Sequence, residues 1–342
     1  MFGHRLFLPL CLICLITFST FTDVASCHQP IARKHIVGST CISPHVPLNS
    51  KASSTIADRD RFKKVYGIDE DSSFNPRNIE WTVDLRPNLS IVKHQGRRNT
   101  CNAFAATALM EYLVWKDKKL TIDLSEAFTY WAAKKFTLNN PQLQDAYATS
   151  DGLAGYLAVE AFEHGTMAEE IWPYEAYNWQ QTGFHKCQLT TGKACMECFT
   201  GRPPTGAEAL DYKLKPIFIK REEMGQFLME KKKPIVFNVW WYMSCIDHST
   251  GLLHLPQPGD DLQRGGHVIL LVGYSAKAKM FIFRNSHGDK WAQSGYGFVS
   301  EEYLLKYYEA KEALAASSQY HPNIQEYLRK ASMGVSGALI DK

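Results

Sequence analysis

Residues 92–104 read VKHQGRRNTCNAF and place Gln95 six residues before Cys101, at a point where the apolar pattern indicates that a helix begins. The unpaired N–H groups and the dipole at a helix N-terminus favour the thiolate form of a cysteine. The Gln95 side-chain amide and the Cys101 N–H would together be placed to hold an oxyanion. A buried structural cysteine beside a loop glutamine is the plainer interpretation of this pair alone, so partners elsewhere must decide.

The composition indicates a folded chain without a strong charge preference. A length of 342 residues suggests one or two domains, and 45% apolar residues are sufficient for a large core. The formal net charge is +3, and basic pairs such as 97–98 and 134–135 lie far apart without interleaved aromatic residues. This pattern argues against nucleic acid or an anionic membrane surface as a partner, and it does not indicate an oligomeric state.

The N-terminus predicts export. Arg5 precedes an apolar run at 6–21, which is too short for a membrane span and has the proportions of a signal-peptide core. We therefore interpret residues 1–26 as a signal peptide and expect an extracellular or periplasmic protein. The letters VASC at 24–27 resemble a bacterial lipobox, so lipid anchoring at Cys27 is one alternative and ordinary signal-peptidase cleavage is the other. A membrane contact is expected only in the first case.

The remaining cysteines suggest disulfides. In an oxidising compartment four of five cysteines would form two bonds, and the fifth cannot be assigned. The five are Cys41, Cys187, Cys195, Cys198 and Cys245. A tetrahedral zinc site made by His185, Cys187, Cys195 and Cys198 is the less favoured alternative, because its spacing is irregular. No cofactor or metal is expected.

Helical patterns come first along the chain and strand patterns follow. The periodicity predicts helices at 103–115, 125–136, 152–164 and 222–231, and strands at 234–242, 268–272, 280–284 and 296–299. Helices before strands indicate an α+β fold of two lobes with a site between them. Residues 27–79 are polar and broken by Ser, Pro and Asp, which is typical of a prosegment or N-terminal arm, and residues 306–342 suggest a helical C-terminal extension.

Two residues at strand ends supply the partners that Cys101 needs. His267 opens one predicted strand and Asn285 follows the next, so a hairpin would bring them together. An imidazole takes the thiol proton, and the Asn285 oxygen would accept the other ring N–H and fix the tautomer. Each residue alone has an ordinary structural interpretation, but the ordered set Gln, Cys, His and Asn is rare by chance.

At this point the chain resembles the papain-like cysteine peptidases. The resemblance covers about residues 81–303 and is carried by motifs in family order, with wording similar to that of bacterial members. These motifs are VDLR at 83–86, QG at 95–96, CNAF at 101–104, LSE at 124–126, WPY at 172–174, GH at 266–267, VGY at 272–274, RNSHG at 284–288 and GYG at 295–297.

The resemblance implies a peptidase domain at 80–305, with a helical left lobe, a β-barrel-like right lobe and an active-site cleft between them. It implies that Cys101 attacks a peptide carbonyl to give a thioester and that His267 acts as acid and base. Asn285 and Gln95 take the roles given above. Substrate-binding positions would include Gly152, Leu153, Gly266 and His287. Protein or peptide substrates follow from this reading.

Four departures from the family pattern leave other functions open. Asn102 stands where the family has tryptophan, Arg98 where it has a disulfide-bonded cysteine, and His287 where a tryptophan shields the His–Asn hydrogen bond. Cys101 and His267 are 166 residues apart, more than the ~130–150 usual in the family. A catalytically weakened peptide-binding protein and an amide acyltransferase on the same scaffold are therefore the alternatives to a peptidase.

Overall fold

The structure is a computed structural model and describes residues 74–138, 152–175, 199–205, 212–257, 260–261, 263–309 and 312–320. Contacts divide the chain into residues 1–34, none of which is described, and residues 35–342, which hold every element below. Among the described residues, none of the helices has the length and apolar character needed to cross a membrane. The predicted signal peptide and the cysteines Cys27, Cys41, Cys187, Cys195 and Cys198 lie outside the described residues.

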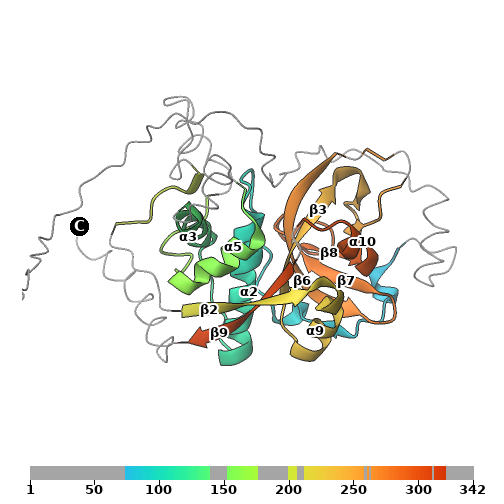
Figure 1. The fold of residues 1–342 in the computed structure, drawn as a ribbon, viewed down its shortest axis with the longest axis horizontal. Helices are drawn as coiled ribbons and strands as arrows, with labels where there is room; N and C mark the ends of the chain where they lie inside the picture. The colour runs from blue at the N-terminus through green and yellow to red at the C-terminus, as the bar shows by residue number, and fades with distance from the viewer. Residues whose placement is uncertain are drawn as a thin grey trace, which may run out of the picture. The chain divides into compact units, whose positions relative to one another are not determined.

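Helices α3 and α5 pack against α2, the helix predicted after Gln95, while α9 and α10 pack against strands. The α-helices are α2 (Cys101–Lys118), α3 (Glu126–Leu138), α5 (Gly155–Glu160), α9 (Met224–Lys231) and α10 (Glu301–Lys306). Short 3₁₀ helices lie at Pro76–Asn78, Arg86–Asn88, Ala161–His164, Arg221–Glu223 and Met243–Cys245. Helix α2 begins at Cys101 as expected and ends where Lys119 adopts the left-handed conformation. Its first fourteen residues are buried, so it is a central core helix packed against α3 and α5 (Figure 1).

Helix α3 shows how sequence sets a helix start. The Ser125 hydroxyl accepts a hydrogen bond from the Phe128 N–H at 3.0 Å and so caps the helix. The same hydroxyl donates to the Trp172 carbonyl at 2.6 Å, which joins the LSE and WPY motifs. The helix predicted at 152–164 begins later than expected, as α5 at Gly155, and continues as a 3₁₀ helix at Ala161–His164.

The described strands form one mixed sheet. They are β1 (Val83–Asp84), β2 (Tyr212–Lys220), β3 (Ile235–Tyr242), β4 (Ile246–Asp247), β5 (Leu252–Leu253), β6 (Arg264–Ser275), β7 (Met280–Arg284), β8 (Tyr296–Ser300) and β9 (Glu312–Tyr320). Their order is β2-β9-β3-β6-β7-β8-β5-β4, with β1 on β6. The sheet is open and does not close into a barrel. The predicted α+β class is confirmed, with helices α3 and α5 beside α2 and, on the other side, strands β6, β7 and β8 with helices α9 and α10 (Figure 1).

The prediction of a helical extension at 306–342 is wrong over residues 312–320. These residues form β9, which pairs along its full length with β2, an unpredicted strand, and touches β3 through Val236 and Leu314. The alanines at 313, 315 and 316 have high helix propensity, but in the sheet they are buried, and tertiary pairing overrides local preference. Residues 321–342 lie outside the described residues.

The folded structure also begins before residue 80. The Phe74 ring lies 5.5 Å from the Phe298 ring on β8, and the Trp81 ring lies 5.6 Å from the same ring. The last residues of the predicted arm therefore pack on the sheet.

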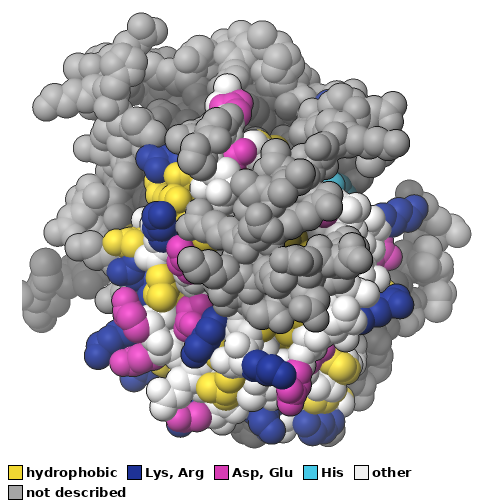
Figure 2. Space-filling view, turned by 90° about the vertical axis from the view of Figure 1, so that its right-hand side faces the viewer, with side chains coloured by type: hydrophobic (Ala, Val, Ile, Leu, Met, Phe, Trp, Pro, Cys, Tyr) yellow, Lys and Arg dark blue, Asp and Glu magenta, His cyan; other side chains and the backbone are white. Residues whose placement is uncertain are grey.

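Basic and acidic side chains are interspersed over the described residues on the face seen in Figure 2.

A buried ion cluster holds the Gln95 segment against the helices. The Lys93 ammonium lies 2.9 Å from Glu126 on α3 and 3.7 Å from Glu111 on α2. Burial by itself would lower the pKa of Lys93, but the Glu126 and Glu111 carboxylates raise it above its ordinary value. The charged Lys93 side chain therefore links the segment that carries Gln95 to helices α2 and α3 through ion pairs.

Candidate active site

Cys101 is the first residue of α2 and its side chain is fully buried. The backbone N–H of Val268 on β6 donates a hydrogen bond of 3.3 Å to its Sγ. The N–H groups in the first turn of a helix have no partner at i−4, so negative charge at this position is stabilised. The sulfur thus lies between the start of α2 and the strand that carries His267.

His267 lies on β6, opposite Val239 of β3, and is buried. Its Nε2 is 2.9 Å from the Asn285 Oδ1, so an N–H on Nε2 donates to that oxygen. Within the described part of the chain, Nδ1 is buried without a hydrogen-bond partner. Burial lowers the pKa of His267 to about 4, and the Asn285 hydrogen bond opposes this only in part. The ring is therefore neutral near pH 7 and presents a basic nitrogen at Nδ1.

Asn285 follows β7 and is fixed on both sides. Its own N–H donates to the Gly295 carbonyl at 3.0 Å, and its Oδ1 also accepts from the Ser286 N–H at 2.8 Å. The predicted hairpin is confirmed, because β6 pairs with β7 from Leu270 opposite Arg284 onward. The hairpin brings His267 and Asn285 together across 18 residues of sequence.

Gln95 is buried and its side chain is held at both ends. The Ser286 hydroxyl donates to Oε1, and Nε2 donates to the Arg98 carbonyl at 2.7 Å. A side-chain amide nitrogen carries two N–H groups, so a second remains for an oxyanion. The Tyr174 hydroxyl bridges the Gln95 carbonyl at 2.8 Å and the Thr100 hydroxyl at 2.6 Å, which fixes this loop relative to the start of α2.

Cys101 is disulfide-bonded in the structure, whereas Cys245, the other described cysteine, is a buried thiol. The expectation that Cys101 stands apart from the disulfides is therefore wrong for this state of the chain. A disulfide sulfur is not a nucleophile, because only the thiolate attacks. The geometry around Cys101 belongs to an oxidised form that has to be reduced before any acyl transfer.

Arg98 explains how the chain manages without the family disulfide in this loop. Its guanidinium is buried and donates to the carbonyls of Glu175 at 3.2 Å and Phe199 at 3.1 Å. It also lies 4.5 Å from the centre of the Tyr174 ring. These contacts join the Gln95 loop to two segments distant in sequence. The Arg98 side chain therefore links parts of the chain by hydrogen bonds at the position where the family pattern has a disulfide-bonded cysteine.

Asn102 has an equally local explanation. It is fully buried, and its Nδ2 donates to the Leu153 carbonyl at 3.1 Å. The segment with Gly152 and Leu153 therefore lies beside the start of α2, as the substrate-binding prediction requires. The Leu153 side chain itself packs in the core. Next along the chain, the Gly155 N–H donates to Asn238 Oδ1 at 3.0 Å, and a Cβ on Gly155 would lie 2.7 Å from that oxygen.

His287 and Trp241 pack against the imidazole of His267, and Trp291 packs against His287. The His287 ring stacks on His267 with centroids 5.6 Å apart and an interplanar angle of 11°. Trp241 meets His267 edge-on at 4.9 Å, and Trp291 meets His287 at 6.0 Å. Burial holds the pKa of His287 well below its ordinary value, and nearby histidines including His267 add to this. A neutral stacked ring and Trp241 thus occupy the neighbourhood where a shielding tryptophan was expected.

Trp241 and Ser286 were missed by sequence reasoning. Ser286 follows Asn285 directly, so a search for donors next to the predicted site would have found it. No spacing connects Trp241 with His267, because only the β3–β6 register sets them near each other. Gly266, a predicted substrate-binding residue, packs under Glu309, and a Cβ there would lie 2.5 Å from a carboxylate oxygen.

Comparison with known proteins identifies the family of the chain. A family profile described as "Papain family cysteine protease" matches residues 75–316. An uncharacterised peptidase C1-like protein of Acanthamoeba polyphaga mimivirus is 32% identical over 243 residues, which are 68% of this chain and 73% of that protein. Ananain of Ananas comosus is 24% identical over 235 residues, which are 67% of this chain and 56% of ananain.

Solved structures show the same fold. Xylellain, a cysteine protease from Xylella fastidiosa, superposes with a TM-score of 0.56 at 21% identity, covering 84% of this chain and 97% of xylellain. At this identity the likeness shows the fold alone.

Proposed function

The chain belongs to the papain family of cysteine proteases and is a cysteine-type peptidase, and on this premise we propose that it cleaves peptide bonds through Cys101 and His267. The observation that carries the assignment is the buried 2.9 Å contact between His267 Nε2 and Asn285 Oδ1. This contact leaves Nδ1 of the same ring able to accept the proton of Cys101. The Cys101 sulfur accepts a hydrogen bond from the backbone N–H of Val268, so it lies beside the strand segment that carries His267.

The reaction runs in two halves once Cys101 is reduced. The thiol proton passes to His267 Nδ1, the sulfur attacks the peptide carbonyl, and the imidazolium protonates the leaving amine as the C–N bond breaks. Water then gives its proton to His267 and attacks the thioester, which releases the acid and restores the thiol. Asn285 keeps the proton on Nε2 throughout, so that Nδ1 is the nitrogen that exchanges protons.

Gln95 stabilises the oxyanion in both halves. The Ser286 and Arg98 contacts fix its amide plane before substrate arrives, so little reorganisation is needed when charge develops on the carbonyl oxygen. Removing one such donor costs roughly 10²–10³ in kcat in acyl-transfer enzymes.

Covalent labelling tests the assignment against a peptide-binding protein. The reduced chain, both full-length and in its exported, processed form, is treated with an epoxide peptide inhibitor and analysed by mass spectrometry, beside a Cys101→Ala variant. One adduct on Cys101 in the wild type and turnover of a fluorogenic peptide library are expected. A folded wild-type chain that is neither labelled nor active would instead support the peptide-binding alternative. Amide products formed with added amines in excess of hydrolysis would support the acyltransferase.

We propose in addition that the chain is exported and that part of residues 27–79 is removed on activation. The apolar run at 6–21 supports export, and the polar composition of 27–79 supports a prosegment. Because Phe74 packs on Phe298, cleavage should fall before residue 74. N-terminal mass spectrometry of active, exported protein tests this, and finding residues 27–73 intact in it would contradict the prosegment. Labelled fatty acid on Cys27 would identify a lipoprotein.

A further inference from the structure

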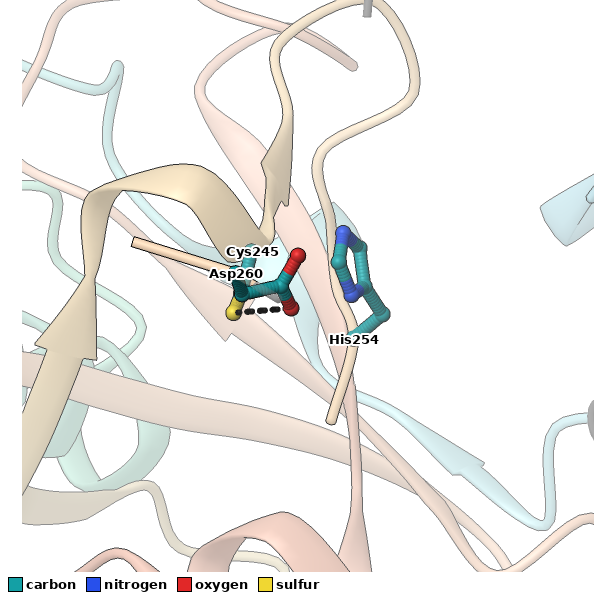
Figure 3. Close-up of side chains that lie close together, drawn as sticks. All are labelled: Cys245, His254 and Asp260. Atoms are coloured by element: carbon teal, nitrogen blue, oxygen red, sulfur yellow. Dashed lines mark hydrogen bonds between the residues drawn. The ribbon is translucent and has the colours of Figure 1, made fainter. Parts of the chain in front are cut away.

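We propose that Cys245, His254 and Asp260 bind a zinc ion in the loop that connects β3 to β6. A ligand atom from each of the three side chains lies within 4.8 Å of the others, and Figure 3 shows them converging from three parts of this loop. The cluster is separate from the Cys101 site and plays no part in the proposed reaction.

The local fold explains why these residues meet. Strands β4 and β5 form a small hairpin in which Ile246 faces Leu253, so Cys245 and His254 occupy the next opposed positions. The His254 N–H donates to the Cys245 carbonyl at 2.9 Å, which continues this pairing. Facing positions of an antiparallel pair place their Cβ atoms ~4.5–5.5 Å apart, within reach of one metal ion.

Asp260 reaches the pair through a separate turn. Its N–H donates to the Gln257 carbonyl at 3.1 Å, and its Oδ2 accepts from the Gln257 N–H at 2.6 Å. The neighbouring Asp261 carbonyl accepts from the Ser244 hydroxyl at 2.8 Å, which holds the turn against the residue before Cys245. The carboxylate is thus oriented before any ion arrives, as carboxylate ligands of metal sites generally are.

The distances and donor types suit zinc. The Cys245 sulfur lies 3.6 Å from Asp260 Oδ2. Zinc–sulfur bonds of ~2.3 Å and zinc–oxygen bonds of ~2.0–2.2 Å at a tetrahedral angle separate the two ligand atoms by about 3.5–3.7 Å. Thiolate, imidazole and carboxylate are the three ligand types that zinc takes from proteins, and water would complete the tetrahedron.

The surroundings of the ligands also fit. His254 Nδ1 lies 3.2 Å from the Leu255 carbonyl, so a proton there would be held by the backbone and would leave Nε2 for the metal. Cys245 is fully buried while His254 and Asp260 are partly exposed, so an ion enters from their side. Binding replaces the thiol proton by the S–Zn bond and releases that proton to solvent, so affinity rises with pH.

The ion would close a loop next to the catalytic strand. Met243 N–H donates to the Gln263 carbonyl at 3.4 Å, and β6 with His267 begins at Arg264. A metal bond between residues 245, 254 and 260 would restrict this loop in the folded chain. The bound ion should therefore raise the melting temperature, because it binds the folded state and not the unfolded one.

The test uses the full-length protein in its oxidised form, in which Cys101 is disulfide-bonded and is not available as a thiolate ligand. Cobalt(II) is titrated first, because a cobalt–thiolate bond gives a charge-transfer band in the near ultraviolet, and zinc is then used to displace it. One cobalt per chain with this band, proton release on binding and a higher melting temperature with zinc are expected. The band should be absent when Cys245→Ser is added.

Variants of His254 and Asp260, which are partly exposed, are less disruptive to folding than a variant of the buried Cys245, so they test metal binding in a folded protein. His254→Gln and Asp260→Asn should weaken zinc binding by more than the roughly 10-fold to 100-fold that loss of an outer partner costs. His248→Gln and Asp261→Asn, from the same loop, are the matched controls and should leave affinity unchanged. No cobalt uptake by the folded, oxidised protein, or equal affinity in the ligand variants and their controls, would overturn the proposal. The cluster would then be a thiol–carboxylate hydrogen bond and nothing more.

Discussion

The N–H of Val268 donates a 3.3 Å hydrogen bond to the Sγ of Cys101, which joins the first residue of α2 to the residue after the catalytic histidine. One main-chain contact thus sets the sulfur beside His267. In the structure this sulfur is part of a disulfide, so the geometry of the site is assembled while its chemistry is blocked.

Activity should depend on a reductant. Without one, the full-length protein should show no turnover above that of Cys101→Ala and no epoxide adduct on Cys101, because a disulfide sulfur does not attack a carbonyl. Adding dithiothreitol should bring both to the wild-type maximum. The measurement is peptide hydrolysis with parallel intact-mass analysis, and equal labelling before and after reduction would contradict the prediction.

Replacing Asn285 by alanine should lower kcat and leave KM nearly unchanged. Its hydrogen bond orients a ring that becomes charged during the reaction, and such bonds contribute about 1.5–3 kcal/mol. This corresponds to a fall in kcat of roughly 10-fold to 150-fold. Steady-state kinetics on the reduced enzyme check it, with thermal melting to confirm the fold. A kcat within twofold of wild type would show that Trp241 and His287 hold the ring alone.

The stability of the oxidised protein should fall as the pH drops from 6.5 to 4. Unfolded His267 takes a proton near pH 6.5, whereas burial lowers its pKa in the folded chain to about 4. The unfolded state therefore binds more protons in this window, and stability rises with pH across it. Between pH 6.5 and pH 4 the contribution of His267 lowers the free energy of unfolding by about 3 kcal/mol, at about 1.4 kcal/mol per pH unit.

Denaturant unfolding of wild type and His267→Gln isolates this effect. Other buried histidines contribute to both proteins, so the difference between the two curves belongs to His267. The free energy of unfolding of the wild type minus that of His267→Gln should be constant above pH 6.5. Between pH 6.5 and 4 it should fall as the pH falls. Parallel curves over the whole range would mean that His267 takes up its proton equally in both states.

Arg98→Met should destabilise the protein by about 1.5–3 kcal/mol, since it removes charged hydrogen bonds to the carbonyls of Glu175 and Phe199, the second of which is buried. It should also lower kcat, because the Arg98 side chain holds in place the loop whose backbone carbonyl accepts from the Gln95 amide. Arg97→Met is the matched control, because Arg97 is exposed. Chemical denaturation compares the two variants, and equal stabilities would remove Arg98 from its cross-linking role.

The catalytic part of the site could be predicted from sequence because its members stand at element boundaries. Cys101 begins a helix, His267 lies near the start of a strand and Asn285 follows the next one, and each boundary has a local signal. The zinc cluster could not be predicted, because Cys245, His254 and Asp260 are nine and six residues apart and are joined by a hairpin and a turn with no standard spacing.

The wrong helix at 312–320 has a different cause. The sequence EALAASSQY has strong local helix propensity and no alternation that marks a strand. What makes it a strand is the edge offered by β2, itself unpredicted, and the Val236–Leu314 pair on β3. The strand conformation of residues 312–320 is thus set by pairing with β2 and β3 and not by the local sequence of these residues.

The position of β9 also governs when the domain is able to finish folding. It is the last described strand to be synthesised, yet it lies between β2 and β3 in the sheet. A ribosome-bound chain that lacks residues 312–320 has β2 without its only described strand neighbour, so the helices are made well before the sheet is complete. The sheet therefore stays incomplete until residues 312–320 have been synthesised and are free to pair.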